Sequence, residues 1–245
     1  MNNEATIEML NRLKLFGMAR GFGDRLASAA QADLTHGEFV GLLVQDEKTE
    51  RDNRRLRRIL KNARLKQEAS LENIDYRHQR GLQKQTLLEL ANPAWIEAGH
   101  NVILTGPTGV GKSYIACALG NMAARASETV LYIRASRLFE SLATARGDGT
   151  HLRLMQKYGK AKVLIVDDFL ITPLTEESRS DFLEVIEDRC GTGATVVTSQ
   201  CPAKEWHQNI GDPTIADAIC DRLLHNSYKI ELRGESLRKK KREQN

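Results

Sequence analysis

Apolar residues in the first 68 positions recur every three or four residues, which is the spacing of one face of a helix. Two such stripes consist of Ile7, Leu10, Leu13, Phe39, Leu42 and Leu43. Thr35 precedes Glu38 by three positions, as in a capping box, so a second long helix is expected to begin there. We therefore predict an all-helical N-terminal domain over residues 1–68, followed by a linker over residues 69–85.

From residue 86 onward the pattern changes to short apolar runs that are separated by longer, helix-favouring segments. The runs that we predict to be strands are 101–105, 129–133, 162–167, 194–199 and 228–232. Short apolar runs of this kind indicate strands that are buried on both faces. Strands that alternate with helices indicate a parallel sheet covered by helices. We therefore predict an α/β domain over residues 86–245, with a five-stranded parallel sheet and a short basic C-terminal tail.

The composition of the chain, with 41% hydrophobic and 28% charged residues, is typical of a globular protein. No apolar stretch approaches the length of a membrane span, and the acidic N-terminus lacks a secretory pattern. The four cysteines have no C-x-x-C spacing, so buried free thiols in a reducing cytoplasm are expected. We accordingly expect a cytoplasmic protein with no membrane partner.

The net charge of +4 is unevenly distributed along the chain. Residues 51–66 contain eight Lys or Arg and one acid, Asp52, around an apolar stripe. This pattern favours contact with nucleic-acid phosphates over a merely solvated face, because clustered cations gain affinity by releasing counterions. Aromatic anchors for a membrane surface are missing. The DNA contacts expected in this helix are Arg51, Arg54, Arg55, Arg58 and Lys61.

The segment GPTGVGKS, at residues 106–113, lies between a predicted strand and a predicted helix. It matches G-x-x-x-x-G-K-[ST], whose glycines let backbone N–H groups surround phosphate oxygens. Lys112 would reach the β- and γ-phosphates, Ser113 would bind Mg²⁺, and the positive end of the helix would lie beneath the phosphates. The expected nucleotide contacts are Gly106, Pro107, Thr108, Gly109, Val110, Gly111, Lys112, Ser113 and Tyr114.

The run VLIVDDF, at residues 163–169, ends in two aspartates. Carboxylates at the end of a buried strand lie where α/β sheets bind ligands. Asp167 would hold Mg²⁺ together with Ser113, since this ion retains several waters and needs few protein ligands. Asp168 would orient the attacking water. Two adjacent aspartates alone would also fit an acidic turn, but their place after a complete phosphate loop favours the catalytic interpretation.

Polar residues near the ends of later elements are further candidates for catalysis. Thr198 and Ser199 end the fourth predicted strand, where they would contact the γ-phosphate or the attacking water, or simply form a polar strand end. Arg222 lies near the end of a predicted helix. It is compatible with an arginine finger that stabilises the transition state in a neighbouring subunit, and equally with a surface arginine.

Residues 134–162 are predicted to form two helices that are broken at Gly147, Asp148 and Gly149. The segment carries seven Lys or Arg and two acids, which favours DNA contact over a solvated surface. The DNA contacts expected here are Arg137, Arg153 and Lys157.

The chain resembles AAA+ ATPases, and closely the IstB-type transposition helper family, which is encoded beside IstA-type transposases in bacterial insertion sequences. The resemblance covers nearly the whole chain. It rests on EAGHNVILTGPTGVGKSYIACALG, KVLIVDDF, VVTSQCPAKEW and GDPTIADAICDRLLHNSYKIELRGESLR. The same residues are more distantly similar to the DnaC helicase loaders and the DnaA initiator.

The resemblance implies that residues 106–113 are the Walker A loop and that Asp167 and Asp168 are the Walker B pair. It places Ser199 at or next to the sensor-1 position, with Thr198 as the near alternative. It matches Arg222 to the arginine finger and Arg238 to the sensor-2 residue, a further nucleotide contact. The sequence departs from general AAA+ proteins in two ways. It has an Asp-Asp rather than an Asp-Glu pair, which implies slow intrinsic hydrolysis, and it is expected to lack a full C-terminal helical lid.

The expected function is an ATPase that uses ATP and Mg²⁺ and assembles on double-stranded DNA as a ring or spiral of identical subunits. It would assist an IstA-type transposase and hydrolyse ATP at its subunit interfaces. The expected catalytic residues are Lys112, Asp167, Asp168, Ser199 and Arg222. The nearest alternative is a DnaC-like helicase loader. The others are a monomeric P-loop kinase for small molecules and a DNA-binding scaffold that binds ATP without useful hydrolysis.

Overall fold

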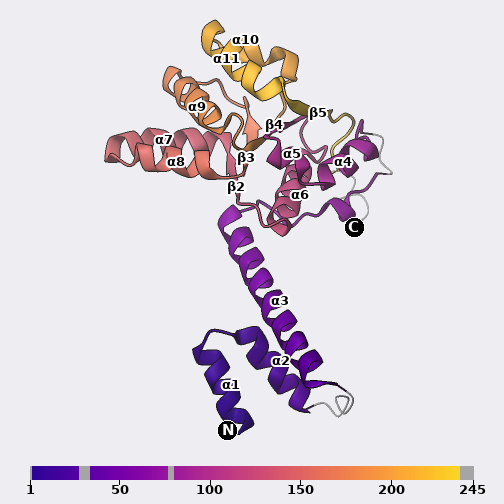
Figure 1. Cartoon of the computed structure of the whole chain (residues 1–245). Coiled ribbons are helices and arrows are strands. Elements are labelled where there is room, and N and C mark those ends of the chain that lie inside the picture. Colours follow the sequence, from indigo (N-terminus) through magenta and orange to yellow (C-terminus); the bar gives the residue numbers. More distant parts are fainter. Residues whose placement is uncertain (1, 28–33, 77–79, 238–245) are drawn as a thin grey trace. The chain divides into compact units, whose positions relative to one another are not determined.

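The computed structural model describes residues 2–27, 34–76 and 80–237, which fall into two compact units (Figure 1). The first unit comprises Met1–Arg58 and the second comprises Ile59–Asn245. The predicted boundary at residue 68 and the predicted linker over 69–85 differ from this division. Ala69 and Ile74 are each only 5% exposed, so the part of this segment around them is packed within the second unit.

The first unit is helical, as the spacing of apolar residues predicts. It contains α1 (Asn3–Arg12), α2 (Phe16–Ala27) and most of α3 (His36–Ala63). The capping box at the start of α3 is confirmed. The Glu38 carboxylate accepts the Thr35 N–H at 2.8 Å, and the Thr35 hydroxyl accepts the Glu38 N–H at 3.3 Å.

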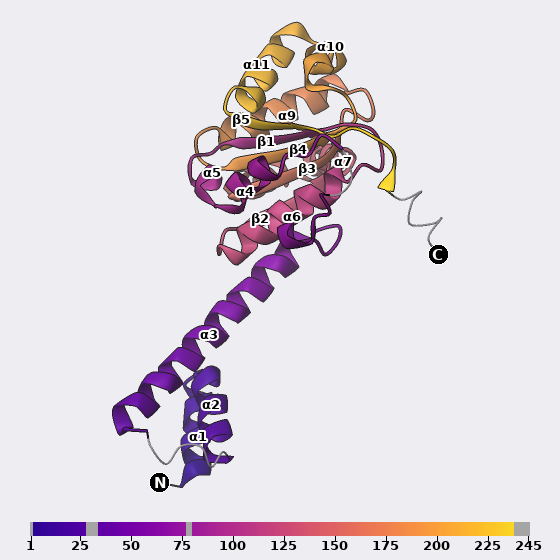
Figure 2. The same ribbon diagram turned by 90° about the vertical axis from the view of Figure 1, so that its right-hand side faces the viewer.

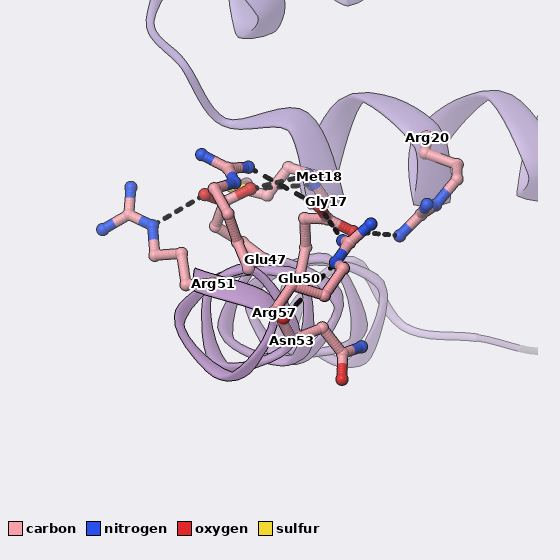
Figure 3. A network of polar contacts seen from close by, with 9 residues as sticks. Gly17, Met18, Arg20, Glu47, Glu50, Arg51, Asn53 and Arg57 are labelled. Carbon is pink, nitrogen blue, oxygen red and sulfur yellow. Dashed lines mark hydrogen bonds and ion pairs between the residues drawn. The ribbon is translucent and has the colours of Figure 1, made fainter. Parts of the chain in front are cut away.

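The beginning of α2 is held by a buried carboxylate from α3 (Figure 3). Glu47 accepts the backbone N–H groups of Gly17 at 2.7 Å and Met18 at 3.3 Å, and the Arg51 Nε at 2.7 Å. Burial opposes ionisation of Glu47, but these hydrogen bonds outweigh it and hold its pKa below the usual value. Gly17 is required because an added Cβ would lie 2.5 Å from the Asp46 carbonyl oxygen.

The second unit is built on a five-stranded sheet in which every pairing is parallel (Figure 2). Its strands are β1 (Asn101–Thr105), β2 (Val130–Arg134), β3 (Val163–Phe169), β4 (Ala194–Ser199) and β5 (Ser227–Glu231). The spatial order is β2-β3-β4-β1-β5. The predicted strands agree with these bounds to within two residues, and the predicted sheet is confirmed.

Helices cover both faces of this sheet. The remaining helical elements are η2 (Leu71–Asn73), α4 (Lys84–Ala91), α5 (Ala94–Glu97), α6 (Lys112–Arg125), α7 (Ala135–Asp148), α8 (His151–Lys160), α9 (Glu176–Arg189), η3 (Ala203–Glu205), α10 (Trp206–Ile210) and α11 (Pro213–Leu224). Ile103 and Val197 face a core that they share with α7, α8, α9, α10 and α11. The opposite face packs on α6, where an added Cβ on Gly120 would lie 2.8 Å from Ile165.

The predicted break between two helices after β2 is confirmed, because α7 ends at Asp148 and Gly149 adopts a left-handed backbone with φ 75°. All four cysteines are free. Their predicted burial is confirmed for Cys117 and wrong for Cys190, which is exposed, while Cys201 and Cys220 are half-buried. Among the described residues, no helix is both long and apolar enough to cross a membrane.

A buried arginine fixes the sheet at the end opposite to the nucleotide loop. Arg189, the last residue of α9, is 1% exposed. It donates to the carbonyl groups of Tyr158 at 2.8 Å, Ala161 at 2.6 Å and Ala194 at 2.5 Å. Burial lowers the pKa of Arg189 to about 10. One side chain thereby satisfies carbonyl groups near the starts of β3 and β4, which would otherwise be buried without donors.

We predict that Glu47→Ala lowers the free energy of unfolding by about 2 kcal/mol, because buried N–H groups at the start of α2 lose a charged acceptor. Urea denaturation of the full chain, followed by circular dichroism, would measure this loss. Glu8→Ala is the matched control, since the Glu8 pair with Arg12 is also i,i+4 but its side chains are 66% and 77% exposed. Equal losses in the two variants would contradict the assignment.

Candidate nucleotide-binding site

The predicted phosphate loop connects the carboxyl end of β1 to the start of α6 (Figure 2). Three of its glycines have left-handed backbones, with φ of 139° at Gly106, 88° at Gly109 and 103° at Gly111. An added Cβ on Gly106 would lie 2.1 Å from the Leu232 carbonyl oxygen. Glycine is therefore required both by the backbone conformation and by the available space.

The segment after β5 lies along this loop. The Leu232 N–H donates to the Thr105 carbonyl at 2.7 Å, and the Leu237 N–H donates to the Gly109 carbonyl at 3.0 Å. An added Cβ on Gly109 would lie 2.1 Å from the Ser236 hydroxyl. The loop is thus held between its own helix and the chain that follows the last strand.

The Lys112 side chain contacts the beginning of the loop. Its Nζ donates to the carbonyl oxygens of Gly106 at 2.7 Å and Pro107 at 2.8 Å. Burial lowers the pKa of Lys112, although Asp168 and Asp167 oppose this shift. No side chain caps the N-terminus of α6, so its first N–H groups remain available for an anion. The loop thus presents an ammonium group and helix N–H groups together, as phosphate binding requires.

Arg80 supports the loop from a segment that the sequence suggested was a linker. It is 6% exposed, and its Nη1 donates to the Val110 carbonyl at 3.1 Å while its Nη2 donates to the Asp75 carbonyl at 3.1 Å. The Arg80 carbonyl accepts the Arg233 N–H at 2.9 Å. Burial lowers the pKa of Arg80. No local motif marks this arginine as part of the site, because its contacts with Val110 and Arg233 span about 30 and 150 positions of the chain.

The centre of the site is the carboxylate of Asp167 at the end of β3, which is fully buried. Its Oδ1 accepts from the hydroxyl groups of Ser113 at 2.7 Å and Thr198 at 2.6 Å. Its Oδ2 accepts from the Tyr132 hydroxyl at 2.5 Å and from the Lys66 ammonium at 3.2 Å. Burial disfavours the charged form, but these four groups outweigh it and lower the pKa of Asp167.

Tyr132 and Lys66 were not predicted to belong to this site. Tyr132 lies within β2, the strand that pairs with β3. Lys66 follows the end of α3, and the sequence placed it in the basic stretch. Its contact with Asp167 spans 101 positions of the chain, so no local pattern would have revealed it. A tyrosine in an apolar run was the only local signal for Tyr132.

The predicted Mg²⁺ ligands fit this ion. The Ser113 hydroxyl and an Asp167 oxygen lie 2.7 Å apart, and both are the hard oxygen donors that Mg²⁺ prefers. Within the described ranges, no group of three or more His, Cys, Asp or Glu could hold a metal ion. One carboxylate and one hydroxyl would be enough protein ligands for Mg²⁺, because this ion retains several waters and takes further ligands from substrate phosphates.

Asp168 has an unusual backbone for a residue that ends a strand. Its φ is 62°, and the pairing of β3 with β4 shifts register between Val166 and Phe169. Asp tolerates the left-handed region better than most residues, because its short polar side chain bonds locally. Its N–H donates to the Thr198 hydroxyl at 2.9 Å. The bulge turns Asp168 away from the strand alternation, which leaves it half-buried beside the phosphate loop.

The two hydroxyl residues at the end of β4 have different surroundings. Thr198 contacts Asp167 and Asp168 directly, as described above. The Ser199 hydroxyl instead donates to the Phe169 carbonyl at 2.7 Å and accepts the Cys201 N–H at 3.1 Å. The structure therefore brings Thr198 to the acidic pair and uses Ser199 to hold the adjacent backbone.

The other predicted nucleotide contacts lie around the loop. The Thr108 hydroxyl donates to the Gln200 side-chain oxygen at 2.7 Å, which joins the loop to the end of β4. Val110 is buried and Pro107 is exposed. Tyr114 is half-buried in the first turn of α6.

Arg222 lies at the other end of the sheet from this site in its own chain. Its carbonyl accepts the side-chain amide of Asn101, the first residue of β1, at 2.9 Å. Its guanidinium pairs with Glu187 at 2.8 Å, and the two side chains are 31% and 47% exposed. Arg238, predicted to be the sensor-2 residue, lies outside the described residues, as does most of the segment on which the absence of a lid was predicted.

Two of the five DNA contacts predicted on α3, Arg51 and Arg54, pair with carboxylates of the same unit. Arg51 pairs with Glu47 (Figure 3), and Arg54 pairs with Glu50 at 3.7 Å. Glu50 also pairs with Arg57 at 3.3 Å and Arg20 at 2.8 Å, and the Arg54 guanidinium lies 4.8 Å from the centre of the Phe16 ring. Arg55 also has an interaction partner, whereas Arg58 and Lys61 are exposed.

The basic residues predicted after β2 line one groove between α7 and α8. The groove has a volume of about 750 Å³, and Arg137, Arg153 and Lys157 are in its lining. Arg137 pairs with Glu140 at 2.7 Å, and both of these side chains are more than half exposed. Arg153 and Lys157 are exposed on α8. The structure thus brings together basic residues that the sequence only predicted to share a segment.

The fold and this site define a P-loop nucleotide-binding protein of the AAA+ class. The solved DnaI structure aligns with a TM-score of 0.58 and 22% identity over 72% of this chain and 93% of that one. The DnaC helicase loader aligns with a TM-score of 0.56 and 16% identity over 67% of this chain and 96% of that one. At these identities the likeness concerns the fold alone.

The model of the IstB-like ATP binding protein family matches residues 8–245. A Sinorhizobium fredii protein that carries the name insertion sequence ATP-binding protein is 46% identical over 237 residues, 97% of each chain. The correspondingly named IS21 protein of Pseudomonas aeruginosa is 35% identical over 96% of this chain and 88% of its own length. The chain therefore belongs to the IstB-like ATP-binding protein family and is an AAA+ ATPase, which confirms the predicted resemblance.

We predict that Thr198→Val lowers ATP turnover at least about tenfold, because Asp167 and Asp168 both lose the hydroxyl that positions them. The affinity for nucleotide should change little, since the phosphate loop is untouched. Ser199→Ala is the matched control, and it should lower the melting temperature more than the turnover. Steady-state kinetics and thermal melts of both variants would measure this. A larger loss of turnover in Ser199→Ala would return the sensor role to Ser199.

Proposed function

We propose that this protein is an ATP- and Mg²⁺-dependent ATPase that assembles on double-stranded DNA and assists the transposase of an insertion sequence. The observation that carries the proposal is the meeting of the Walker A Ser113 and the Walker B Asp167 at 2.7 Å. A hydroxyl and a carboxylate at this spacing suit a Mg²⁺ ion that bridges two phosphates of ATP. Lys112 would stabilise the charge on the same phosphates.

Hydrolysis would depend on the residues that orient the attacking water beside the γ-phosphate. Asp168 would orient the attacking water, and Thr198 would hold Asp168 through its backbone N–H. The Asp168 side chain is one methylene shorter than the glutamate of most AAA+ proteins, so its contact with water would be longer or indirect. We therefore expect slow turnover until DNA or a partner adjusts the site.

Completion of the site by a neighbouring subunit is supported by the place of Arg222. The Arg222 backbone contacts the start of β1, whereas the phosphate loop follows its end. Five residues of strand separate these points by roughly 13 Å, at about 3.3 Å per residue. Arg222 is thus badly placed for its own ATP, but its partly exposed pair with Glu187 can exchange for a phosphate of the next subunit. ATP would then stabilise the oligomer, and hydrolysis would weaken it.

DNA binding is supported by two groups of basic residues. The first comprises the exposed Arg58 and Lys61 on α3, and the second comprises Arg137, Arg153 and Lys157 in the α7–α8 groove. Contacts of this type are made with phosphates, so they provide affinity with little sequence preference. Arg51 and Arg54 would contribute less, since carboxylates already neutralise them.

The context of transposition is supported by the relatives, whose names place them in insertion sequences. An IstA-type transposase is the partner we propose. The nearest alternative, a loader of a replicative helicase, is favoured only by the likeness of fold to DnaC and DnaI. A pull-down that uses the full chain, with its N-terminal helices intact, would show whether the bound protein is a transposase or a helicase.

We predict that Arg222→Ala lowers turnover about a thousandfold and abolishes the ATP-dependent assembly on DNA, because the transition state loses a charge supplied by the neighbour. Asp168→Asn should also be inactive while still binding ATP. An equimolar mixture of the two variants should recover about a quarter of the wild-type rate, since random assembly restores that share of the interfaces. Turnover assays and light scattering coupled to size exclusion would measure both effects.

Arg125→Ala is the matched control for this experiment, because the Arg125 pair with Glu72 is also exposed but joins α6 to η2 rather than α11 to α9. It should retain the wild-type rate and assembly. A mixture that stays inactive, or a wild type that hydrolyses ATP as a monomer, would contradict the shared site. Turnover in Asp168→Asn equal to wild type would favour a scaffold that binds ATP without useful hydrolysis.

We predict that the double variant Arg137→Ala, Arg153→Ala weakens DNA binding and reduces the slope of log affinity against log salt by about 2, the loss of two phosphate contacts. Fluorescence anisotropy with a duplex at several salt concentrations would measure the slope. Arg125→Ala again provides a control for loss of charge elsewhere. Unchanged affinity and slope would exclude the α7–α8 groove from the interface.

A further inference from the structure

We propose that Lys66 is the counter-ion of Asp167 in the metal-free protein, and that Mg²⁺ must compete with it when nucleotide binds. Lys66 would thereby set the Mg²⁺ concentration that the site requires. This inference rests on the Mg²⁺–ATP site proposed above and adds a regulating residue to it. Lys66 acts through Asp167 and is therefore a positioning residue rather than a catalytic one.

The first argument is the cost of burying a carboxylate. Asp167 is 0% exposed, and an ionised group in that position needs a compensating charge. Ser113, Thr198 and Tyr132 supply only neutral hydroxyl groups. Lys66 forms the ion pair with Asp167 at 3.2 Å, and its side chain is 26% exposed. The ammonium group thus reaches inward from the surface to neutralise the buried acid.

The second argument is that the backbone of Lys66 is fixed on the helix that carries Ser113. The Cys117 thiol on α6 accepts the backbone N–H groups of Lys66 and Gln67. The side-chain amide of Asn121, also on α6, donates to the Ala69 carbonyl at 2.9 Å. The fold therefore holds the backbone of Lys66 beside Asp167.

The third argument is the division of donors between the two carboxylate oxygens. Ser113 contacts Oδ1, so a cation held by Ser113 and Asp167 would approach from that side. Lys66 contacts Oδ2 of the same carboxylate. Two cations on one carboxylate repel each other, so Mg²⁺ binding must weaken or displace the Lys66 contact. The chain connects this contact directly to the proposed DNA-binding helix, because Lys66 comes three residues after Ala63, the last residue of α3.

The experiment uses the full-length protein and titrates Mg²⁺ at pH 8 against a fluorescent, non-hydrolysable ATP analogue. Lys66→Gln removes the charge but keeps a hydrogen-bond donor, and we expect it to lower the half-saturating Mg²⁺ concentration about tenfold. Lys66→Arg keeps the charge and should match the wild type. Lys48→Met is the control for the loss of one exposed positive charge elsewhere on α3, and it should also match the wild type.

Thermal melts provide a second measurement that does not depend on nucleotide. In EDTA, Lys66→Gln should melt at a lower temperature than the wild type, because Asp167 has lost its counter-ion. Mg²⁺ alone should raise the melting temperature of Lys66→Gln more than that of the wild type. If Lys66→Gln does not fold, Lys66→Met is titrated in its place, and rescue of folding by Mg²⁺ alone would support the proposal.

An unchanged or higher Mg²⁺ requirement in Lys66→Gln would overturn the inference, as would an equal shift in Lys48→Met. These results leave the proposed ATPase site intact. A wild type that binds the analogue equally well without Mg²⁺ would instead contradict the metal site itself, and the inference would fail with it.

Discussion

The second unit depends on one buried carboxylate. Asp167 lies near the carboxyl end of β3, and its charge must be satisfied by groups from several other elements. Ser113 comes from α6, Tyr132 from β2, Thr198 from β4, and Lys66 from the chain after α3. A buried charge with fewer donors would cost several kcal/mol. The same requirement that stabilises the fold therefore assembles the nucleotide site.

The phosphate loop is held by backbone contacts on more than one side. In the segment 232–237, backbone N–H groups donate to carbonyl groups of Thr105, just before the loop, and Gly109, within it. Arg80 donates to the Val110 carbonyl. Such support lets the loop keep the left-handed backbones of its glycines before any phosphate binds. The loop is preorganised, so less of the binding energy of ATP is spent on ordering it.

The basic helix illustrates a difference between net charge and available charge. Residues 51–66 carry a large positive excess, yet Glu47 and Glu50 lie one turn earlier and pair with several of the arginines. Lys66, at the other end of this stretch, pairs with Asp167. Arg51, Arg54 and Arg57 are engaged with carboxylates, so fewer cations of α3 are available than the sequence window suggested. Charge counted over a window therefore overestimates a DNA-binding surface whenever acids lie just outside it.

The sequence by itself determined the features that depend on local spacing. The phosphate loop, the five strands, the helix pair after β2 and the capping box at Thr35 follow from backbone geometry and periodicity within a few residues. The tertiary structure alone decided which side chains meet across long separations. In the structure, Thr198 rather than Ser199 contacts Asp167, and Lys66 and Tyr132 contact the same carboxylate. Arg80, from the predicted linker, donates to the phosphate loop. These contacts depend on strand order and register, which no local pattern in the chain specifies.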